Sequence, residues 1–273
     1  MTAQIIDGVL IAREIESELK IRIGKLAFKP ILSVIQIGDD SASSSYIKAK
    51  TKAANRVGIE LQHHHLPIDI SLTDLNSLID KLNSDSNGII IQLPIPETLL
   101  SCLTRISPEK DVDGFHPMNL GLLMRGEPTL LPCTPAGIIE LLQRSNYNLN
   151  GKHVVVVGRS NIVGKPLANL LLNKGIDATT TICHSKTKDI SQHTKSADIV
   201  VVATGYLNTL NEDMVTENTI VIDVGVNRTD DGLVGDCAPN VANKVKAITP
   251  VPGGVGPMTV AMLMSNTVSA SEQ

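Results

Sequence analysis

Short continuous apolar runs, each ending in a turn, dominate the second half of the chain. Such runs occupy residues 153–157, 199–203 and 220–224, and residues 179–183 also look like a strand. Residues 164–174 fit a helix between the strands at 153–157 and 179–183. Strands of a parallel sheet are buried on both faces, so they show continuous rather than alternating apolar residues. We therefore predict an α/β domain with a mainly parallel sheet.

The first half of the chain has the same alternation of strands and helices. Residues 31–37 indicate a buried strand, 43–57 a helix, and 89–93 a second strand between Gly88 and Pro94. Between the strands, residues 72–82 form an amphipathic pattern, with Leu75, Leu78, Ile79 and Leu82 on one helical face. This half is therefore predicted to be a separate α/β domain.

Residues 116–135 contain prolines and glycines that interrupt regular structure, and we interpret them as the passage between domains. A helix is predicted from Pro135, with Thr134 as its N-cap, and a last helix from Pro257. We expect domains at 1–118 and 119–256. We also expect the helix in 257–273 to pack back on the first domain.

Composition and charge narrow the function classes. Of the 273 residues, 42% are hydrophobic and 19% charged, which is sufficient for globular cores. The formal net charge of −4 argues against nucleic-acid binding. No apolar run approaches the roughly 20 residues of a membrane helix. The first residues lack the pattern of a targeting peptide, so we expect a cytoplasmic protein.

Neither the cysteines nor the histidines predict a metal centre. Cys102, Cys133, Cys183 and Cys237 lie far apart without a CxxC pair, which favours a reduced, cytosolic setting. Residues 63–65 are three histidines, but adjacent side chains on an extended segment point to opposite faces. We expect a surface strand or loop there and no bound metal.

The strand at 153–157 leads into a turn suited to a pyrophosphate. Gly158-Arg159-Ser160 and Gly164 give the pattern GxSxxxG ahead of a helix, where backbone N–H groups and the positive helix end attract anions. The standard GxGxxG pattern has glycine where Ser160 stands. A tight turn that binds nothing is the alternative, and the strands that follow disfavour it.

The end of the next strand bears on the choice of cofactor. NAD enzymes commonly place a carboxylate there, on the ribose hydroxyls. Here Cys183 is followed by His184, Ser185 and Lys186, and Arg159 supplies another cation. This favours a ribose 2′-phosphate and hence NADP, although Lys186 by itself reads as a surface lysine.

Lys50 interrupts an apolar stripe of the helix at 43–57. Tyr46, Lys50, Ala53 and Val57 are expected to share one face. An ammonium on such a face is costly unless it is paired or deprotonated. Periodicity alone leaves two interpretations open, a functional lysine or one whose ammonium reaches past the stripe to water.

Three further features suggest a ligand site. Gln92 is the one polar residue of its predicted strand, near the carboxyl end, where open α/β sheets bind ligands. Asp111 and Asp113 either face the same way or belong to a capped turn at Gly114. A glycine-rich loop at 250–259 enters the last helix, and such loops let backbone approach a ligand closely.

Together these segments resemble the methylenetetrahydrofolate dehydrogenase–cyclohydrolase family, in the family's order and over nearly the whole chain. The YxxxK, QLPxP, DVDG and PGGVGPMT motifs are highly specific in combination. The matching segments are residues 43–50, 92–96, 110–115, 132–135, 158–166 and 250–259.

The resemblance implies a fold and a reaction. The fold would be an N-terminal α/β substrate domain and a C-terminal Rossmann-type NADP-binding domain, with a cleft between them. The enzyme would oxidise 5,10-methylenetetrahydrofolate with NADP to the methenyl cation and hydrolyse this to 10-formyltetrahydrofolate. It would be a homodimer that binds tetrahydrofolate derivatives, not nucleic acid or membranes.

The resemblance also implies residue roles. Lys50, Gln92 and Asp113 match catalytic positions: the lysine itself, the amide that orients it and the carboxylate that binds the pterin. The expected substrate contacts are Tyr46, Pro252 and Gly253, and the expected cofactor contacts are Gly158, Arg159, Ser160, Ser185 and Val226.

Two departures from the family pattern concern loop shape. Residues 235–239 are Gly-Asp-Cys-Ala-Pro where the family usually has Gly-Asp-Val-Asp-Phe, and the stretch after Pro96 is short. Two other hypotheses remain for the whole chain: an NADP dehydrogenase for another small metabolite, and a non-catalytic nucleotide-binding protein. Lys50, Gln92 and Asp113 argue against both.

Overall fold

The chain forms two compact α/β units in the computed structural model, which describes residues 3–230 and 232–273. Unit 1 comprises Met1–Ala12 and Thr134–Thr259, and unit 2 comprises Arg13–Cys133 and Val260–Gln273. Within the described residues, no helix is both long and apolar enough to cross a membrane.

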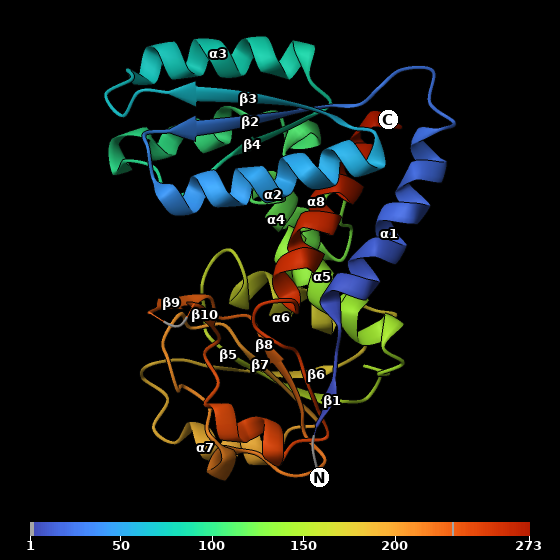
Figure 1. Cartoon of the computed structure of the whole chain (residues 1–273), viewed down its shortest axis with the longest axis vertical. Helices are drawn as coiled ribbons and strands as arrows, with labels where there is room; N and C mark the ends of the chain where they lie inside the picture. Colours follow the sequence, from blue (N-terminus) through green and yellow to red (C-terminus); the bar gives the residue numbers. More distant parts are fainter. Residues whose placement is uncertain (1–2, 231) are drawn as a thin grey trace. The chain divides into compact units, whose positions relative to one another are not determined.

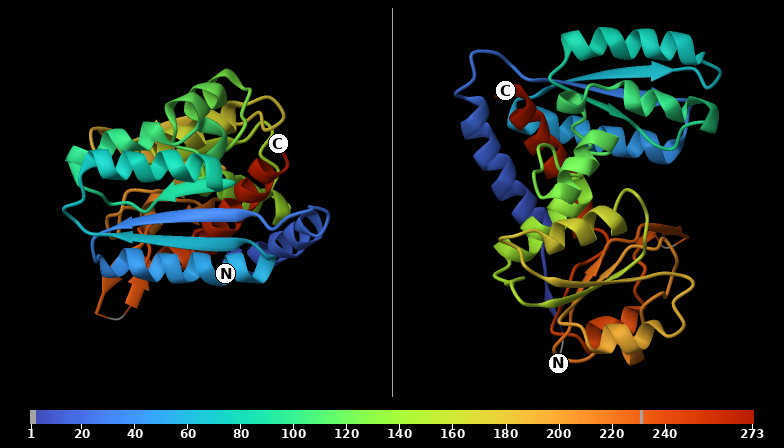
Figure 2. Two further views of the ribbon diagram at one scale, coloured as in Figure 1. Left: turned by 90° about the horizontal axis from the view of Figure 1, so that it is seen from above. Right: turned by 180° about the vertical axis from the view of Figure 1, so that it is seen from behind.

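Unit 2 is built on a parallel sheet in the order β3-β2-β4. Its strands are β2 (Ile31–Ile37), β3 (Glu60–Leu66) and β4 (Gly88–Ile91). Helices α2 (Ser41–Val57) and α3 (Leu72–Asp85) cover opposite faces of this sheet (Figures 1 and 2). The apolar stripe of α3 is buried against the sheet at Leu75, Ile79 and Leu82, as its periodicity predicts.

Local signals fix the ends of α2. The Asp40 carboxylate accepts a hydrogen bond from the Ser43 N–H at 2.7 Å and caps the first turn. Gly58 ends the helix with φ 97°, in the left-handed region that glycine adopts without strain. These caps set the position of Lys50 along the helix.

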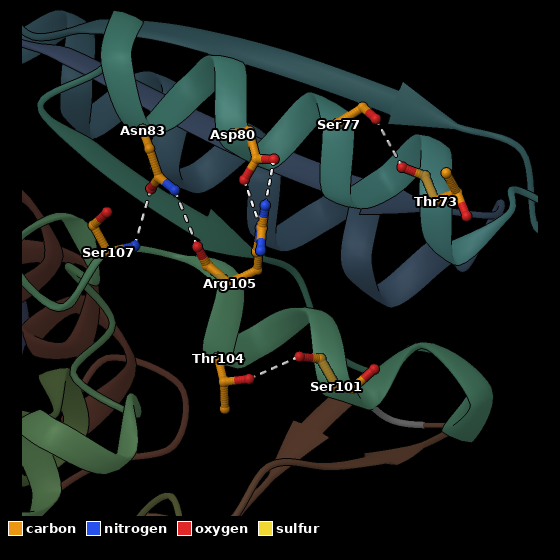
Figure 3. Close-up of polar contacts among 8 residues, drawn as sticks. All are labelled: Thr73, Ser77, Asp80, Asn83, Ser101, Thr104, Arg105 and Ser107. Atoms are coloured by element: carbon orange, nitrogen blue, oxygen red, sulfur yellow. Dashed lines mark hydrogen bonds and ion pairs between the residues drawn. The ribbon is translucent and has the colours of Figure 1, made fainter.

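The stretch after Pro96 is a 3-10 helix, η1 (Glu97–Arg105), which is fastened to α3 (Figure 3). Asn83 Nδ2 donates to the Arg105 carbonyl at 3.0 Å, and Asn83 Oδ1 accepts from the Ser107 N–H at 2.9 Å. Arg105 also pairs in two places with Asp80. These contacts define the path of the chain from β4 towards Asp111, although the segment is short.

Unit 1 contains a parallel sheet in the order β1-β11-β8-β7-β5-β6. Its apolar strands form a core with partners such as Leu210, Val241 and Val245. This unit also contains three helices, α5 (Cys133–Arg144), α6 (Gly164–Leu172) and α7 (Ile190–Lys195), although Cys133 itself is counted in unit 2. The strands are β1 (Gln4–Ile5), β5 (His153–Val157), β6 (Thr179–Cys183), β7 (Ile199–Val202), β8 (Ile220–Asp223) and β11 (Ala247–Ile248).

The N-terminal strand and helix were not predicted. β1 pairs in parallel with β11, and α1 (Gly8–Ile23) follows, with the Asp7 carboxylate accepting from the N–H groups of Val9 and Leu10. β1 is too short to give a periodic signal. In unit 2, Arg22 near the end of α1 pairs with Glu272, after α8 (Val255–Ser271).

Two sequence-based expectations for residues 116–135 need correction. A helix, α4 (Pro117–Arg125), lies where irregular structure was expected. Pro117 is at its first turn and Gly126 ends it with φ 77°, so these residues mark the ends of the helix. The change of unit falls at 133/134 rather than 118/119. Asn119 is buried and donates to the Asp111 carboxylate at 2.9 Å, which keeps α4 in unit 2.

Smaller elements complete the described chain. A hairpin of β9 and β10 lies in unit 1, and three further 3-10 helices connect larger elements. Their bounds are β9 (Asn227–Thr229), β10 (Gly232–Val234), η2 (Pro108–Lys110), η3 (Glu212–Met214) and η4 (Pro239–Asn243).

Candidate active site and cofactor site

Lys50 lies at the centre of a polar cluster inside unit 2. Its Nζ donates to Gln92 Oε1 at 2.9 Å, and Gln92 Nε2 donates to the Leu93 carbonyl at 2.9 Å. Gln92 directly follows β4 rather than lying within the strand, at the carboxyl end of the sheet. The lysine is therefore held by the protein and does not simply extend to water.

Burial of this cluster opposes the charged form of the lysine, while the charge of its neighbour favours it. Desolvation by burial lowers the Lys50 pKa, while the Asp113 carboxylate acts in the opposite direction. Burial raises the Asp113 pKa, and the charge of Lys50 counters this. Each charge thus offsets part of the desolvation cost of the other, which keeps a titratable pair in a poorly hydrated setting.

Cys133 is a member of this cluster that the sequence did not single out for chemistry. Its thiol lies against the Asp113 carboxyl and donates to the Val112 carbonyl at 3.2 Å. Burial and the Asp113 charge raise its pKa well above the ordinary value, which keeps the thiol protonated.

Asn266 is a second unexpected member, contributed by α8. Its Nδ2 donates to the carbonyls of Val112 at 2.9 Å and Leu131 at 2.8 Å. These two carbonyls belong to the segments that carry Asp113 and Cys133. Asn266 is far along the sequence from both segments, so no local sequence pattern indicated these contacts.

The two aspartates of the DVDG motif have separate surroundings. The Asp111 carboxylate accepts from the His116 N–H at 2.7 Å and from Asn119, and Gly114 N–H closes a turn onto the Asp111 carbonyl. The turn, rather than an extended segment, is the correct interpretation. Only Asp113 lies beside Lys50.

Tyr46 does not share the buried stripe that periodicity predicted for it. It is 45% exposed, whereas Ile47, Ala53 and Val57 are buried. Ala53 and Val57 lie on the buried face as predicted, but at the start of the stripe the buried residue is Ile47 rather than Tyr46, so the phenol ring stands at the surface one turn before Lys50. An exposed ring in that place is available for stacking on a flat ligand.

The predicted pyrophosphate turn follows β5 in unit 1. Gly158 has φ 127°, and a Cβ there would lie 2.2 Å from the Ala203 carbonyl oxygen. A Cβ on Gly164 would lie 2.1 Å from the Gly158 carbonyl oxygen. The Ser160 hydroxyl accepts from the Val163 N–H at 3.1 Å. The serine therefore supports the turn where the standard motif has glycine.

A pocket of about 420 Å³ opens beside this turn. It brings together four of the five residues predicted to bind the cofactor, while Val226 is 48% exposed and is not among the lining residues. Sequence reasoning missed the loop after β7, although ligands commonly bind at carboxyl ends of strands. The lining residues are Val157, Gly158, Arg159, Ser160, His184, Ser185, Ile190, Ala203, Thr204, Tyr206 and Thr209.

The loop that carries Pro252 and Gly253 lies in unit 1 and packs on the start of α1. Gly253 has φ 110°, and Pro252 is exposed. A Cβ placed on Gly8 would lie 1.9 Å from the Gly254 carbonyl oxygen. The two backbones therefore touch, and a side chain at residue 8 would displace the loop.

The three histidines lie on β3. His63 and His65 stack on one face with ring centroids 5.8 Å apart, and His64 contacts Ser33 at 3.3 Å from the other face. Among the described residues, no three His, Cys, Asp or Glu side chains are grouped to hold a metal ion.

Models of known protein families match both parts of the chain. The model for the tetrahydrofolate dehydrogenase/cyclohydrolase catalytic domain matches residues 6–113, and the model for the NAD(P)-binding domain matches 132–273. The chain is thus a two-domain α/β enzyme with a dinucleotide-binding domain. It belongs to the tetrahydrofolate dehydrogenase/cyclohydrolase family.

Individual relatives match along the whole chain. It is 52% identical to the bifunctional protein FolD of Bacillus pumilus, covering 100% of this chain and 99% of that protein. The structure of FolD from Campylobacter jejuni matches with a TM-score of 0.95 and 45% identity over 99% of both chains. The structure of FolD from Trypanosoma brucei, complexed with NADP cofactor and inhibitor, matches with a TM-score of 0.93 and 36% identity. That match covers 100% of this chain and 98% of the other.

Proposed function

We propose that this chain oxidises 5,10-methylenetetrahydrofolate with NADP to 5,10-methenyltetrahydrofolate and then hydrolyses this to 10-formyltetrahydrofolate. One observation carries the proposal. Lys50 is bonded to Gln92 at 2.9 Å beside Asp113, with its pKa lowered by burial, in a domain that matches the family's catalytic domain. A proton-handling lysine is what the hydrolytic step needs.

The pocket of unit 1 fits NADP. Gly158 and Ala203 both line it, and a Cβ on Gly158 would lie 2.2 Å from the Ala203 carbonyl oxygen, so glycine is needed for the turn to come this close to the loop after β7. No carboxylate is among its lining residues in the described part of the chain, while Arg159 and Ser185 can bind a 2′-phosphate. When bound, NADP accepts the hydride of the oxidation. The task of Gly158, Arg159, Ser160 and Ser185 is to hold it in position.

The hydrolytic step is assigned to Lys50. Water adds to the methenyl carbon, and the Lys50 amine takes one proton from that water. The remaining hydroxyl then loses its proton to solvent as the formyl C=O forms and the bond from this carbon to the ring nitrogen breaks. The Lys50 ammonium gives its proton to the leaving ring nitrogen, so one proton is released overall. The lowered pKa leaves more of the amine unprotonated near neutral pH. Gln92 holds one N–H and so orients the amine.

The remaining roles complete the assignment. Tyr46 stacks on the pterin with its exposed ring, and Asp113 accepts hydrogen bonds from the pterin. Pro252 and Gly253 contact substrate, and Val226 contacts the cofactor from outside the pocket lining. These roles rest on the family resemblance together with the positions described above.

The deciding experiment supplies methylenetetrahydrofolate and follows NADPH formation. In parallel, loss of methenyltetrahydrofolate measures hydration. Lys50→Met should keep NADP binding and lose hydration, whereas the control Lys52→Met, an exposed lysine of α2, should keep both. NADP reduction that does not depend on added folate would refute methylenetetrahydrofolate as the substrate. Undiminished hydration in Lys50→Met would refute the role of Lys50 in the hydrolytic step.

We further propose that the protein acts in the cytoplasm as a homodimer and does not bind nucleic acid. The family resemblance supports the dimer. So does the position of β3 at the edge of its sheet, where an unpaired strand edge offers backbone groups to a second copy. Light scattering on the purified chain measures its mass in solution, and a monomer at assay concentration would contradict the dimer.

A further inference from the structure

Asp236 is a completely buried carboxylate in unit 1, between β10 and η4. Its Oδ2 accepts from the Thr204 N–H at 2.7 Å, the Thr204 hydroxyl at 2.9 Å and the Gly205 N–H at 2.8 Å. Its Oδ1 accepts from Asn227 Nδ2 at 2.9 Å. Both carboxylate oxygens of Asp236 therefore accept hydrogen bonds from the protein.

These donors belong to the cofactor site. Thr204 lines the 420 Å³ pocket, and Thr209, which also lines it, donates its N–H to the Asp236 carbonyl at 2.8 Å. Asn227 directly follows Val226, the expected second cofactor segment. A single residue thus connects the loop after β7 with the segment after β8.

Asp236 is itself held by a second buried carboxylate. Asp223, at the end of β8, accepts from the N–H groups of Asp236, Gly225 and Cys237 at 2.9–3.0 Å. A Cβ on Gly225 would lie 2.1 Å from Asp236 Oδ1, and a Cβ on Gly235 would lie 1.9 Å from Asp223 Oδ2. Glycine is therefore needed at both places for backbone to approach the carboxylates.

This network also explains why the departure at 235–239 preserves the loop. Cys237 contributes its backbone N–H to Asp223, and Asp236, which the network needs, is retained. The cysteine side chain takes the place of the usual valine without removing any of these hydrogen bonds.

We propose that Asp236 is a positioning residue for NADP, acting through Thr204 and Gly205. This inference rests on the cofactor part of the proposed function. Because the carboxylate satisfies three donors of the loop before any ligand arrives, the pocket wall has one backbone arrangement and loses little conformational freedom on binding. Without the carboxylate, those donors are free to seek other acceptors and the wall is no longer preorganised.

The first test variant is Asp236→Asn. It keeps the shape of the side chain, but its amide must direct an NH₂ at either Asn227 or the loop donors, so donor faces donor. We expect the Kd for NADP to rise about tenfold or more. The KM for NADP should rise with it, while hydration of methenyltetrahydrofolate stays within about twofold.

Thr204→Val is the second variant. It removes one of the three hydrogen bonds of Oδ2, and with it the contact of the Thr204 hydroxyl with Thr209 at 2.9 Å and the hydrogen bond it accepts from the Tyr206 N–H at 3.3 Å. It should raise the Kd for NADP by a few fold. The matched control is Asp198→Asn. This carboxylate of unit 1 also accepts a backbone N–H, that of His153 at 2.9 Å, but at the amino ends of the strands. We expect it to lower the melting temperature and leave the Kd unchanged.

The measurements are calorimetric titration with NADP, steady-state kinetics and thermal melting of the full chain. Unchanged NADP binding in folded Asp236→Asn and Thr204→Val overturns the inference. An equal loss of oxidation and hydration, with melting lowered as in Asp198→Asn, overturns it as well. If Asp236→Asn does not fold, Thr204→Val decides. If wild type binds NADP but leaves methylenetetrahydrofolate unchanged, the proposed function fails and the binding data still test Asp236.

Discussion

Lys50 Nζ donates to Gln92 Oε1 across 2.9 Å, joining the middle of α2 to the residue that follows β4. The bond fixes a desolvated amine at the carboxyl end of a parallel sheet. Its acceptor is a neutral amide, so the lysine is oriented without receiving a full counter-charge from Gln92. Among the described residues, Asp113 is the carboxylate that raises the Lys50 pKa.

Gln92→Leu should reduce hydration of methenyltetrahydrofolate by about 10- to 100-fold, because the amine loses its orientation while the apolar volume is kept. Oxidation should fall less, since the cofactor supplies its chemistry. The two rates, measured on the same preparation, check this. Gln143→Leu, at an exposed position of α5, is the control and should change neither.

The pH profile of hydration should rise with pH, because the unprotonated Lys50 amine is the active form, and its midpoint should lie below the ordinary lysine pKa. Asp113 raises the Lys50 pKa, so Asp113→Asn should move the midpoint to lower pH even though substrate binding weakens. Initial rates at saturating substrate and constant ionic strength measure the shift. A midpoint that moves to higher pH would contradict this electrostatic assignment.

Gly158→Ala should destabilise unit 1 by roughly 1–3 kcal/mol and abolish NADP binding, because φ 127° is strained for alanine and its Cβ would meet the Ala203 carbonyl. Denaturant unfolding and NADP titration provide the readouts. Gly121→Ala, in α4 with open space around its Cβ, should instead stabilise by about 0.5–1 kcal/mol. A similar loss in both variants would argue against the steric explanation.

Gly8→Ala should raise the KM for methylenetetrahydrofolate several fold with little change in the Kd for NADP. The added methyl group would push against the Gly254 carbonyl and displace the loop of Pro252 and Gly253. Steady-state kinetics with each substrate varied in turn separate the two effects. Gly256→Ala, in α8 with nothing near its Cβ, is the matched control.

Arg159→Ala should weaken NADP binding about tenfold or more and change NAD binding little, because the guanidinium is assigned to the 2′-phosphate. The ratio of kcat/KM for the two cofactors measures this. Lys186→Ala provides the comparison, since its ammonium is at the surface and its residue is outside the pocket lining. An equal loss of kcat/KM with NADP and with NAD would show that Arg159 does not bind the 2′-phosphate.

Buried strands were the part of the fold most readable from the sequence. Strands 31–37 and 153–157 have the predicted limits, because parallel strands buried on both faces leave largely apolar runs. Strand 179–183 also has the predicted limits, although it is a partly exposed edge strand of Thr-Thr-Thr-Ile-Cys. The helix at Pro117–Arg125 was missed because its proline and glycine were interpreted as interruptions rather than as ends. β1 was missed because two residues carry no period.

The site residues that could be predicted are those that each lie in a recognisable local motif. Lys50, Gln92 and Asp113 come together as the motifs suggested, and so do Gly158, Arg159, Ser160 and Ser185. Cys133, Thr204 and Asn266 were not found, since their contributions depend on contacts between distant segments. Asn266 and Val112, for example, are 154 positions apart.

The pairing of β1 with β11 has a consequence for how the protein is made. Gln4 is translated long before its partner Ala247, and at roughly 5–20 residues per second more than about ten seconds separate the two. Unit 2 likewise needs residues from Val260 onward. Neither unit can therefore complete its native contacts before the residues around 247–260 have been made, and until then the sheet of unit 1 lacks the pairing of β1 with β11.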